Sequence, residues 1–207
     1  MAIHRSKEEV VQEFRIRSIQ EATLRVISRK GMAAATMQEI AEEAGVAKGT
    51  IYLYFRDRDE LVEKTFDTAM DQLMVEIDRA LDADTPFEQK IRDVMSAKLA
   101  FFSANREFIR LYLAAKMPES IPERQRQKKK NCHPQYRTRI DKFATVIEQA
   151  IDRGEIRPLD AKRLALFIIE GSTAIILERL TEESSPAEEA DVDLIAGLIL
   201  DGVRKRS

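Results

Sequence analysis

The amino-acid sequence predicts an all-α protein. Three observations favour this fold class: seven glycines and six prolines are few for 207 residues, the chain is rich in residues that favour helices, and its apolar side chains recur at helical spacing. Hydrophobic residues make up 44% of the chain and charged residues 34%, as expected for helices that pack a core beneath a charged surface. No alternating stretch is long enough to predict a sheet.

The first predicted helix covers about residues 6–30 and ends at Gly31, after two basic residues that suit a helix C-terminus. The second follows Thr36, a good N-cap, and Glu39 three residues later completes a capping box. Gly45 then breaks this helix. The glycine and the capping box therefore predict both ends of a short helix.

A third, short helix is predicted over about residues 47–55. Asp57 and Glu60 repeat the capping-box pattern and begin a long helix at about residues 58–81. Turn-forming residues separate the helices that follow. These are predicted at about residues 86–103, 106–116, 135–153, 160–182 and 189–205.

The stretch from Met37 to Arg56 predicts a helix-turn-helix. Gly45 can take the left-handed conformation that a tight corner needs, and Ala41 is small where the two helices must cross closely. A shared apolar core then fixes the crossing angle, so that the second helix can enter a DNA major groove about 12 Å wide. That core consists of Ile40, Ala44, Val46 and Ile51.

The second helix of this motif carries side chains suited to DNA. A lysine can neutralise a phosphate or donate to guanine, a glycine lets the backbone approach, and threonine and tyrosine hydroxyls reach phosphates or base edges. Half-buried packing is the alternative for the two tyrosines, and Phe55 is expected in the core. The candidate DNA-contacting residues are Thr36, Lys48, Gly49, Thr50, Tyr52, Tyr54 and Arg58.

The run TMQEIAEEAGVAKGTIYLYF, from Thr36 to Phe55, and the following Asp-Glu-Leu resemble the tetracycline-repressor (TetR) family of bacterial regulators. The resemblance covers about residues 14–66 and places the seven candidates on positions where that family contacts DNA. It implies a dimeric regulator with a divergent helical C-terminal domain that binds an effector. Ala47 departs from the family, because a serine often caps the recognition helix there, and histidine is frequent in place of Tyr54.

The sequence divides into a DNA-binding domain at residues 1–58 and an effector-binding and dimerisation domain at residues 59–207. Two consecutive helices near the C-terminus have wide apolar faces, which predict a homodimer interface, with an internal core role as the alternative. The predicted interface residues are Leu164, Phe167, Ile168, Gly171, Ile175, Leu194, Leu198 and Gly202.

Methionine and aromatic residues predict a pocket for a small hydrophobic effector, although plain core packing is the alternative for each of them. The candidates are Phe66, Met70, Met74, Met95, Phe102, Phe108, Tyr112, Met117 and Phe143. The expected function is that of a repressor which this effector releases from a near-palindromic operator. An activator, or a regulator that binds a protein partner through its C-terminal domain, is the alternative.

Other classes of protein are not favoured by the sequence. His4 and His133 are the only histidines, and no catalytic, nucleotide-binding or metal-ligand motif occurs, so we expect neither enzyme activity nor a cofactor or metal. The single Cys132 fits a reducing cytoplasm, and no apolar stretch is long enough for a membrane span. The basic tract from Arg124 to Lys130 suits a solvated segment, accessory phosphate contacts or the rim of an anionic effector site.

Overall fold

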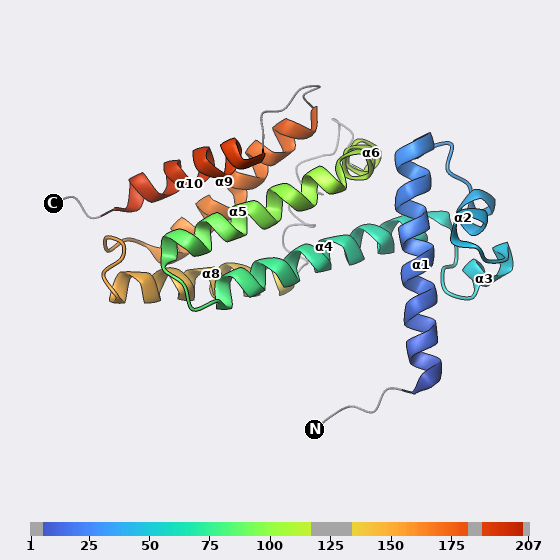
Figure 1. Ribbon diagram of the computed structural model, residues 1–207, viewed down its shortest axis with the longest axis horizontal. Coiled ribbons are helices and arrows are strands. Elements are labelled where there is room, and N and C mark those ends of the chain that lie inside the picture. Colours follow the sequence, from blue (N-terminus) through green and yellow to red (C-terminus); the bar gives the residue numbers. More distant parts are fainter. Residues whose placement is uncertain (1–5, 117–133, 182–187, 205–207) are drawn as a thin grey trace. The chain divides into compact units, whose positions relative to one another are not determined.

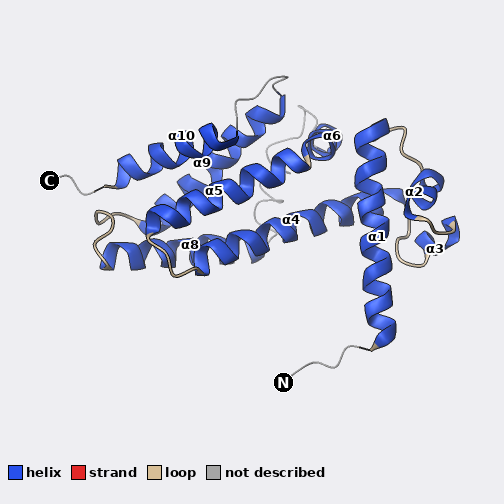
Figure 2. Ribbon diagram, viewed as in Figure 1, coloured by secondary structure: helices blue, strands red, loops and turns tan. Residues whose placement is uncertain are grey.

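The computed structural model describes residues 6–116, 134–181 and 188–204, and within these ranges every regular element is a helix (Figures 1 and 2). The chain forms two compact units. The first comprises Met1–Gln72 and Asn105–Lys116, and the second comprises Leu73–Ala104 and Met117–Ser207. The domain boundary expected at residue 58 stays a prediction of where the DNA-binding part ends, since the compact units divide at other positions. Met117, Cys132, His133 and the basic tract lie outside the described residues.

Helix α1 (Lys7–Lys30) is the central packing element of the first unit. Ser6 caps its start, and the Glu9 carboxylate accepts the Ser6 backbone N–H in return, so the capping box is complete. Four apolar residues of its C-terminal half are buried, and they are Ile19, Ala22, Val26 and Ile27. Gln20 in the same half donates to the Lys64 carbonyl at 3.1 Å and ties α1 to α4 (Arg58–Asp82).

Helices α2 (Met37–Ala44), α3 (Lys48–Tyr52) and α6 (Arg106–Lys116) complete the first unit. Helix α2 packs on both α1 and α3, and α6 also contacts α1. The rings of Phe66 on α4 and Tyr112 on α6 stack with centroids 4.0 Å apart. Aromatic packing therefore joins α6 to the N-terminal part of α4, although Phe66 and Tyr112 are 46 positions apart in sequence.

The second unit packs four helices with the C-terminal part of α4. Helix α5 (Phe87–Ala104) contacts α8 (Pro134–Asp152), α9 (Ala161–Thr181) and α10 (Glu188–Val203), and α8 also packs on α9. Arg157 holds the end of α10 by donating to the Gly202 carbonyl through Nε at 3.1 Å and Nη2 at 3.0 Å. Helix α5 thus lies at the centre of this unit (Figure 1).

The predicted helices agree with the structure in type and nearly in length. The third helix is the main difference, because regular α-helix stops at Tyr52 rather than at Phe55. Leu53 is its C-cap, and the N–H groups of Tyr54 and Phe55 both bond to the Ile51 carbonyl, so the chain closes into a turn. None of the helices described is both long and apolar enough to cross a membrane.

Candidate nucleic-acid interface

Gly45 forms the corner between α2 and α3. Its φ of 67° and ψ of 32° lie in the left-handed region, as the sequence predicted for a tight corner. The Gly45 N–H bonds to the carbonyls of Ala41 and Glu42, and the Val46 N–H bonds to the Ala41 carbonyl at 3.0 Å. These bonds satisfy the end of α2 and turn the chain directly into α3.

Charged pairs hold α2 against α1. The Glu43 carboxylate accepts from Arg25 at 2.8 Å and from Arg29 at 3.0 Å. Hydrogen bonds from Arg25 first, and then from Arg29, lower the pKa of Glu43 below its ordinary value. Since all three side chains are at least partly solvated, we expect each pair to add little to stability and to fix the orientation of α2 instead.

Thr36 caps the start of α2, as predicted. Its hydroxyl oxygen accepts the Glu39 N–H at 3.2 Å, and the Glu39 carboxylate accepts the Thr36 N–H at 3.0 Å. Hydrogen bonds from Lys30, and then from Thr36, lower the pKa of Glu39 from 4.5 to about 2. The Thr36 hydroxyl also lies 3.0 Å from the Glu39 carboxylate, to which it donates. The contact of Thr36 with a phosphate stays a prediction, because the hydroxyl must first give up its hydrogen bond to the Glu39 carboxylate.

The outer face of α3 presents three of the predicted DNA-contacting residues together. Lys48 and Gly49 are exposed, and Tyr52 is 49% exposed. The opposite face carries Ile51, which is fully buried, and Phe55, which is 5% exposed and lies in the core as expected. Helix α3 therefore turns apolar side chains inward. It exposes the Lys48 amine, the bare backbone of Gly49 and the Tyr52 phenol. Thr50 and Tyr54 are half-buried.

Arg58 differs from the other candidates in its surroundings. Its guanidinium donates to the Met32 carbonyl in the turn between α1 and α2, and its Nε is buried without a partner. A phosphate contact by Arg58 stays a prediction. A phosphate would have to compete with the Met32 carbonyl for the Arg58 guanidinium. Sequence reasoning did not select two exposed residues beside α3, Leu53 and Arg56. The one signal in the sequence was that both residues directly follow the predicted DNA-contacting helix. Arg56 pairs with Asp57 at 2.8 Å.

The predicted effector residues fall into both units. In the first unit, Phe108 and Tyr112 are buried, and Phe66 and Met70 are half-buried. Burial raises the pKa of Tyr112, and the nearby charge of Glu63 adds to this effect. In the second unit, buried or half-buried positions are held by Met74, Met95, Phe102 and Phe143.

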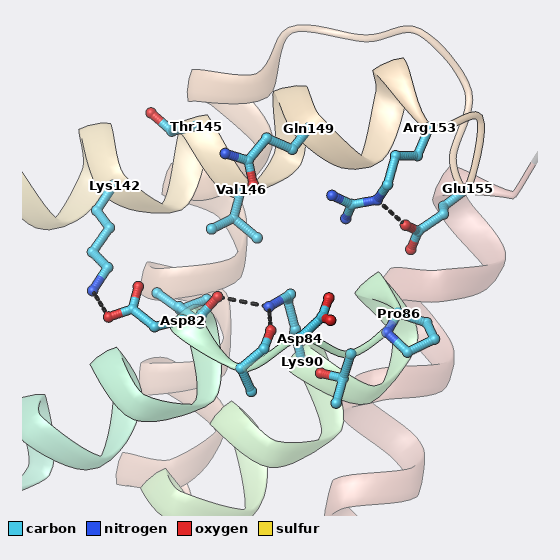
Figure 3. Close-up of a pocket in the computed structure, with 13 residues that line it drawn as sticks. Asp82, Asp84, Pro86, Lys90, Lys142, Thr145, Val146, Gln149, Arg153 and Glu155 are labelled. Atoms are coloured by element: carbon cyan, nitrogen blue, oxygen red, sulfur yellow. Dashed lines mark hydrogen bonds and ion pairs between the residues drawn. The ribbon is translucent and has the colours of Figure 1, made fainter.

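The second unit contains a cavity of about 830 Å³ between the end of α4, the start of α5 and helix α8 (Figure 3). Lys90 is 6% exposed and donates to the carbonyls of Leu81, at 2.7 Å, and Ala83, so its ammonium closes the end of α4. Lys142 lies 2.9 Å from the Asp82 carboxylate on the same rim. The lining offers polar and apolar surface in nearly equal shares, and none of the predicted effector residues belongs to it.

The predicted interface residues of α9 lie mainly along one side of the helix. Leu164, Phe167, Gly171 and Ile175 follow one another at intervals of three or four residues, and Phe167 is 64% exposed. Ile168 is 1% exposed and belongs to the unit's own core. The predicted residues of α10 are all exposed, and they are Leu194, Leu198 and Gly202.

Known proteins resemble this chain over most of its length. Residues 19–65 match the family described as bacterial regulatory proteins, tetR family. An HTH-type transcriptional regulator of Haemophilus influenzae is 32% identical over 188 residues, which cover 90% of this chain and 89% of that protein. The fatty acid metabolism regulator protein of Bacillus subtilis is 27% identical over 152 residues, covering 73% and 76%.

A solved structure shares the fold of both units. The transcriptional regulator FadR from Bacillus subtilis, in complex with stearoyl-CoA, has a TM-score of 0.67 and 19% sequence identity to this chain. The match covers 91% of this chain and 99% of that chain. The likeness in fold therefore extends well beyond the helix-turn-helix.

Proposed function

Because the chain belongs to the TetR family of bacterial transcriptional regulators, we propose that it is a homodimeric repressor that binds a near-palindromic operator and is released by a small hydrophobic effector. The observation that carries this proposal is the outward face of α3, where Lys48, Gly49 and Tyr52 are exposed together. A cation and a phenol beside a bare backbone suit the phosphates and base edges of a major groove.

A dimer is needed to place two α3 helices in successive major grooves, about 34–36 Å apart or a multiple of this spacing. Phe167, Leu194 and Leu198 support a dimer built from α9 and α10, because these large apolar side chains are 55–64% exposed. Covering them with a second copy removes apolar surface from water, which favours association. Two-fold symmetry of the dimer then predicts two-fold symmetry of the operator.

Two observations support the effector part of the proposal: the fold resembles that of a regulator solved with a ligand, and the second unit contains adaptable apolar side chains. The FadR structure that resembles this chain contains stearoyl-CoA, a ligand with a long apolar chain. Met95, Phe102 and Phe143 offer adaptable apolar surface in the second unit. An effector that binds better to a conformer in which the recognition helices are wrongly spaced would release DNA by differential affinity.

Selection of duplexes from a random library, followed by footprinting, tests the DNA-binding part. We expect protected sites with two-fold symmetry. Replacing Lys48 and Tyr52 together with alanine removes contacts worth about 1–3 kcal/mol each, so binding should weaken at least tenfold. Lys162→Ala is the control, since Lys162 is an exposed lysine in the second unit. Asymmetric protection, or unchanged binding by the double variant, contradicts the proposal.

The effector part needs a separate experiment. Stearoyl-CoA and free coenzyme A are added to the protein–DNA complex, and native mass spectrometry searches protein purified from its host for a retained small molecule. We expect the acylated compound to release DNA and free coenzyme A to leave the complex intact. If stearoyl-CoA has no effect and no molecule is retained, the effector part is wrong while the DNA-binding part stands.

A further inference from the structure

The exposed side of α3 contains one large apolar residue, Leu53, among its polar side chains. Leu53 follows the helix as its C-cap with a helical backbone (φ −71°, ψ −22°), and it is 76% exposed. This is the highest exposure among the large hydrophobic side chains of the described residues. At about 100° per residue, Leu53 lies about 160° around the helix from the buried Ile51 and about 40° from Gly49, so these two residues share the outer arc of the helix with Tyr52.

Gly49 lies between Tyr52 and Leu53 on this arc. Its backbone φ is not positive, and a Cβ added to it would meet no atom within 4 Å. An alanine would therefore fit, and alanine favours a helix more than glycine does. The folded chain alone gives no reason for a glycine here. Its absent side chain instead leaves bare backbone on the outer side of α3, one helical turn before Leu53.

We propose that Leu53 recognises the C5-methyl group of a pyrimidine in the major groove, and that Gly49 admits the base edge. This inference rests on the proposed function, because α3 must enter the groove. A leucine side chain has no hydrogen-bond donor or acceptor, and the C5-methyl group is the apolar feature that base pairs present in the major groove. Lys48 and Tyr52, which lie further around the helix, supply the polar contacts.

The size of the effect follows from the surface removed from water. Leu53 is exposed before binding, so contact with a methyl group covers apolar surface on both partners. Burying one such group changes affinity about three- to fivefold for each half-site. Thymine carries the C5-methyl group in ordinary DNA, and 5-methylcytosine carries it in methylated DNA, so the experiment must separate these two sources.

Replacement of thymine by deoxyuridine tests the inference, because deoxyuridine lacks the methyl group and keeps the same donors and acceptors. Each thymine of a duplex selected by the protein is replaced in turn. We expect one position in each half-site at which the replacement weakens binding of the natural protein about three- to fivefold and does not change binding of Leu53→Ala. Each cytosine of the same duplex is methylated at C5 in turn, and a gain in affinity that depends on Leu53 assigns the source to 5-methylcytosine.

Two variants complete the design. Val75→Ala is the matched control, since Val75 on α4 is also an exposed aliphatic residue, and it should leave every methyl effect in place. Gly49→Ala should keep or raise thermal stability while it weakens DNA binding. The inference is overturned if the methyl effects at all positions are the same for Leu53→Ala and the natural protein. If the protein selects no duplex at all, the proposed function itself fails.

Discussion

At the scale of single residues, Gly45 determines the corner between α2 and α3. Its φ of 67° costs an L-residue about 1–2 kcal/mol, and no atom lies within 4 Å of an added Cβ, so backbone strain alone should set the effect. Gly45→Val should lower the free energy of unfolding by about 1–2 kcal/mol. Gly45→Asn should lower it less, because asparagine tolerates this conformation. Urea denaturation measures both, and equal losses would contradict the backbone explanation.

Lys98 on α5 is a buried cation whose hydrogen-bond acceptors are all neutral. Its ammonium donates to the Ile169 carbonyl at 3.3 Å and to the hydroxyls of Ser172 and Thr173 at 2.5 Å and 3.0 Å. Burial lowers the pKa of Lys98 from 10.5 to about 8, and the charge of Glu170 opposes this shift. The folded state therefore binds the Lys98 proton more weakly than the unfolded chain does.

Lys98→Met should raise the free energy of unfolding at pH 7 by about 1–3 kcal/mol, because it removes the cost of burying a charge. The two hydroxyls stay satisfied, since they donate to the carbonyls of Ile168 and Ile169. The cost of burying the charge is complete below pH 8 and declines between pH 8 and pH 10.5. Over that range the free energy of unfolding of the natural protein should therefore approach that of the variant.

Chemical denaturation at pH 7, 9 and 10.5 measures this difference. Lys162→Met on the surface of α9 is the control, and its difference from the natural protein should not change over the same range. A variant at Lys98 that is less stable than the natural protein at pH 7 would show that the hydrogen bonds outweigh the desolvation of the charge.

At the scale of elements, α3 is a five-residue helix that begins without a side-chain cap at Ala47. A serine at this position can accept an N–H from the first turn, so Ala47→Ser should raise the free energy of unfolding by about 0.5–1 kcal/mol. Thr36→Ala is the opposite control, because it removes the observed cap of α2 and should cost about 1 kcal/mol. Thermal and urea denaturation check both changes. No gain from serine would mean that packing on α2 already fixes the start of α3.

Local chemistry explains why most of the helices could be predicted from the sequence. Caps and glycines act within a few residues, so Thr36, Gly31 and Gly45 marked the helix ends that the structure contains. Periodicity also separated the inward Ile51 from the outward Tyr52. It could not show that Arg58 turns to the Met32 carbonyl, because that contact joins residues 26 positions apart.

The same limit applies to the apolar faces of α9 and α10. Periodicity found a broad apolar pattern there, but it did not separate Ile168, which is 1% exposed, from Phe167, which is 64% exposed. Which side of an apolar helix turns inward depends on its neighbours, and α5 and α8 are those neighbours for α9. The predicted effector site is the part that the sequence constrains least, because buried methionine and phenylalanine serve a core and a ligand equally well.

At the scale of the whole molecule, the proposed dimer would link two α3 helices through one interface when it binds DNA. Binding of one helix places the second at a high effective concentration near its half-site, so losing the dimer should weaken operator binding strongly even though α3 is unchanged. The number of phosphates contacted together also halves. The slope of log affinity against log salt concentration should therefore fall to about half.

Replacing Phe167 and Leu198 together with glutamate tests this link. Both side chains are 64% exposed, so the charges stay solvated in the single chain, and the free energy of unfolding of a monomer should change little. Across a dimer interface the same charges would be buried or would face one another, so sedimentation should show monomers. Val75→Glu is the control, because Val75 is exposed on α4 and should leave the dimer intact. A double variant that remains dimeric would place the interface elsewhere, whereas a monomer that keeps the full salt slope would show that one copy of the chain makes all the phosphate contacts.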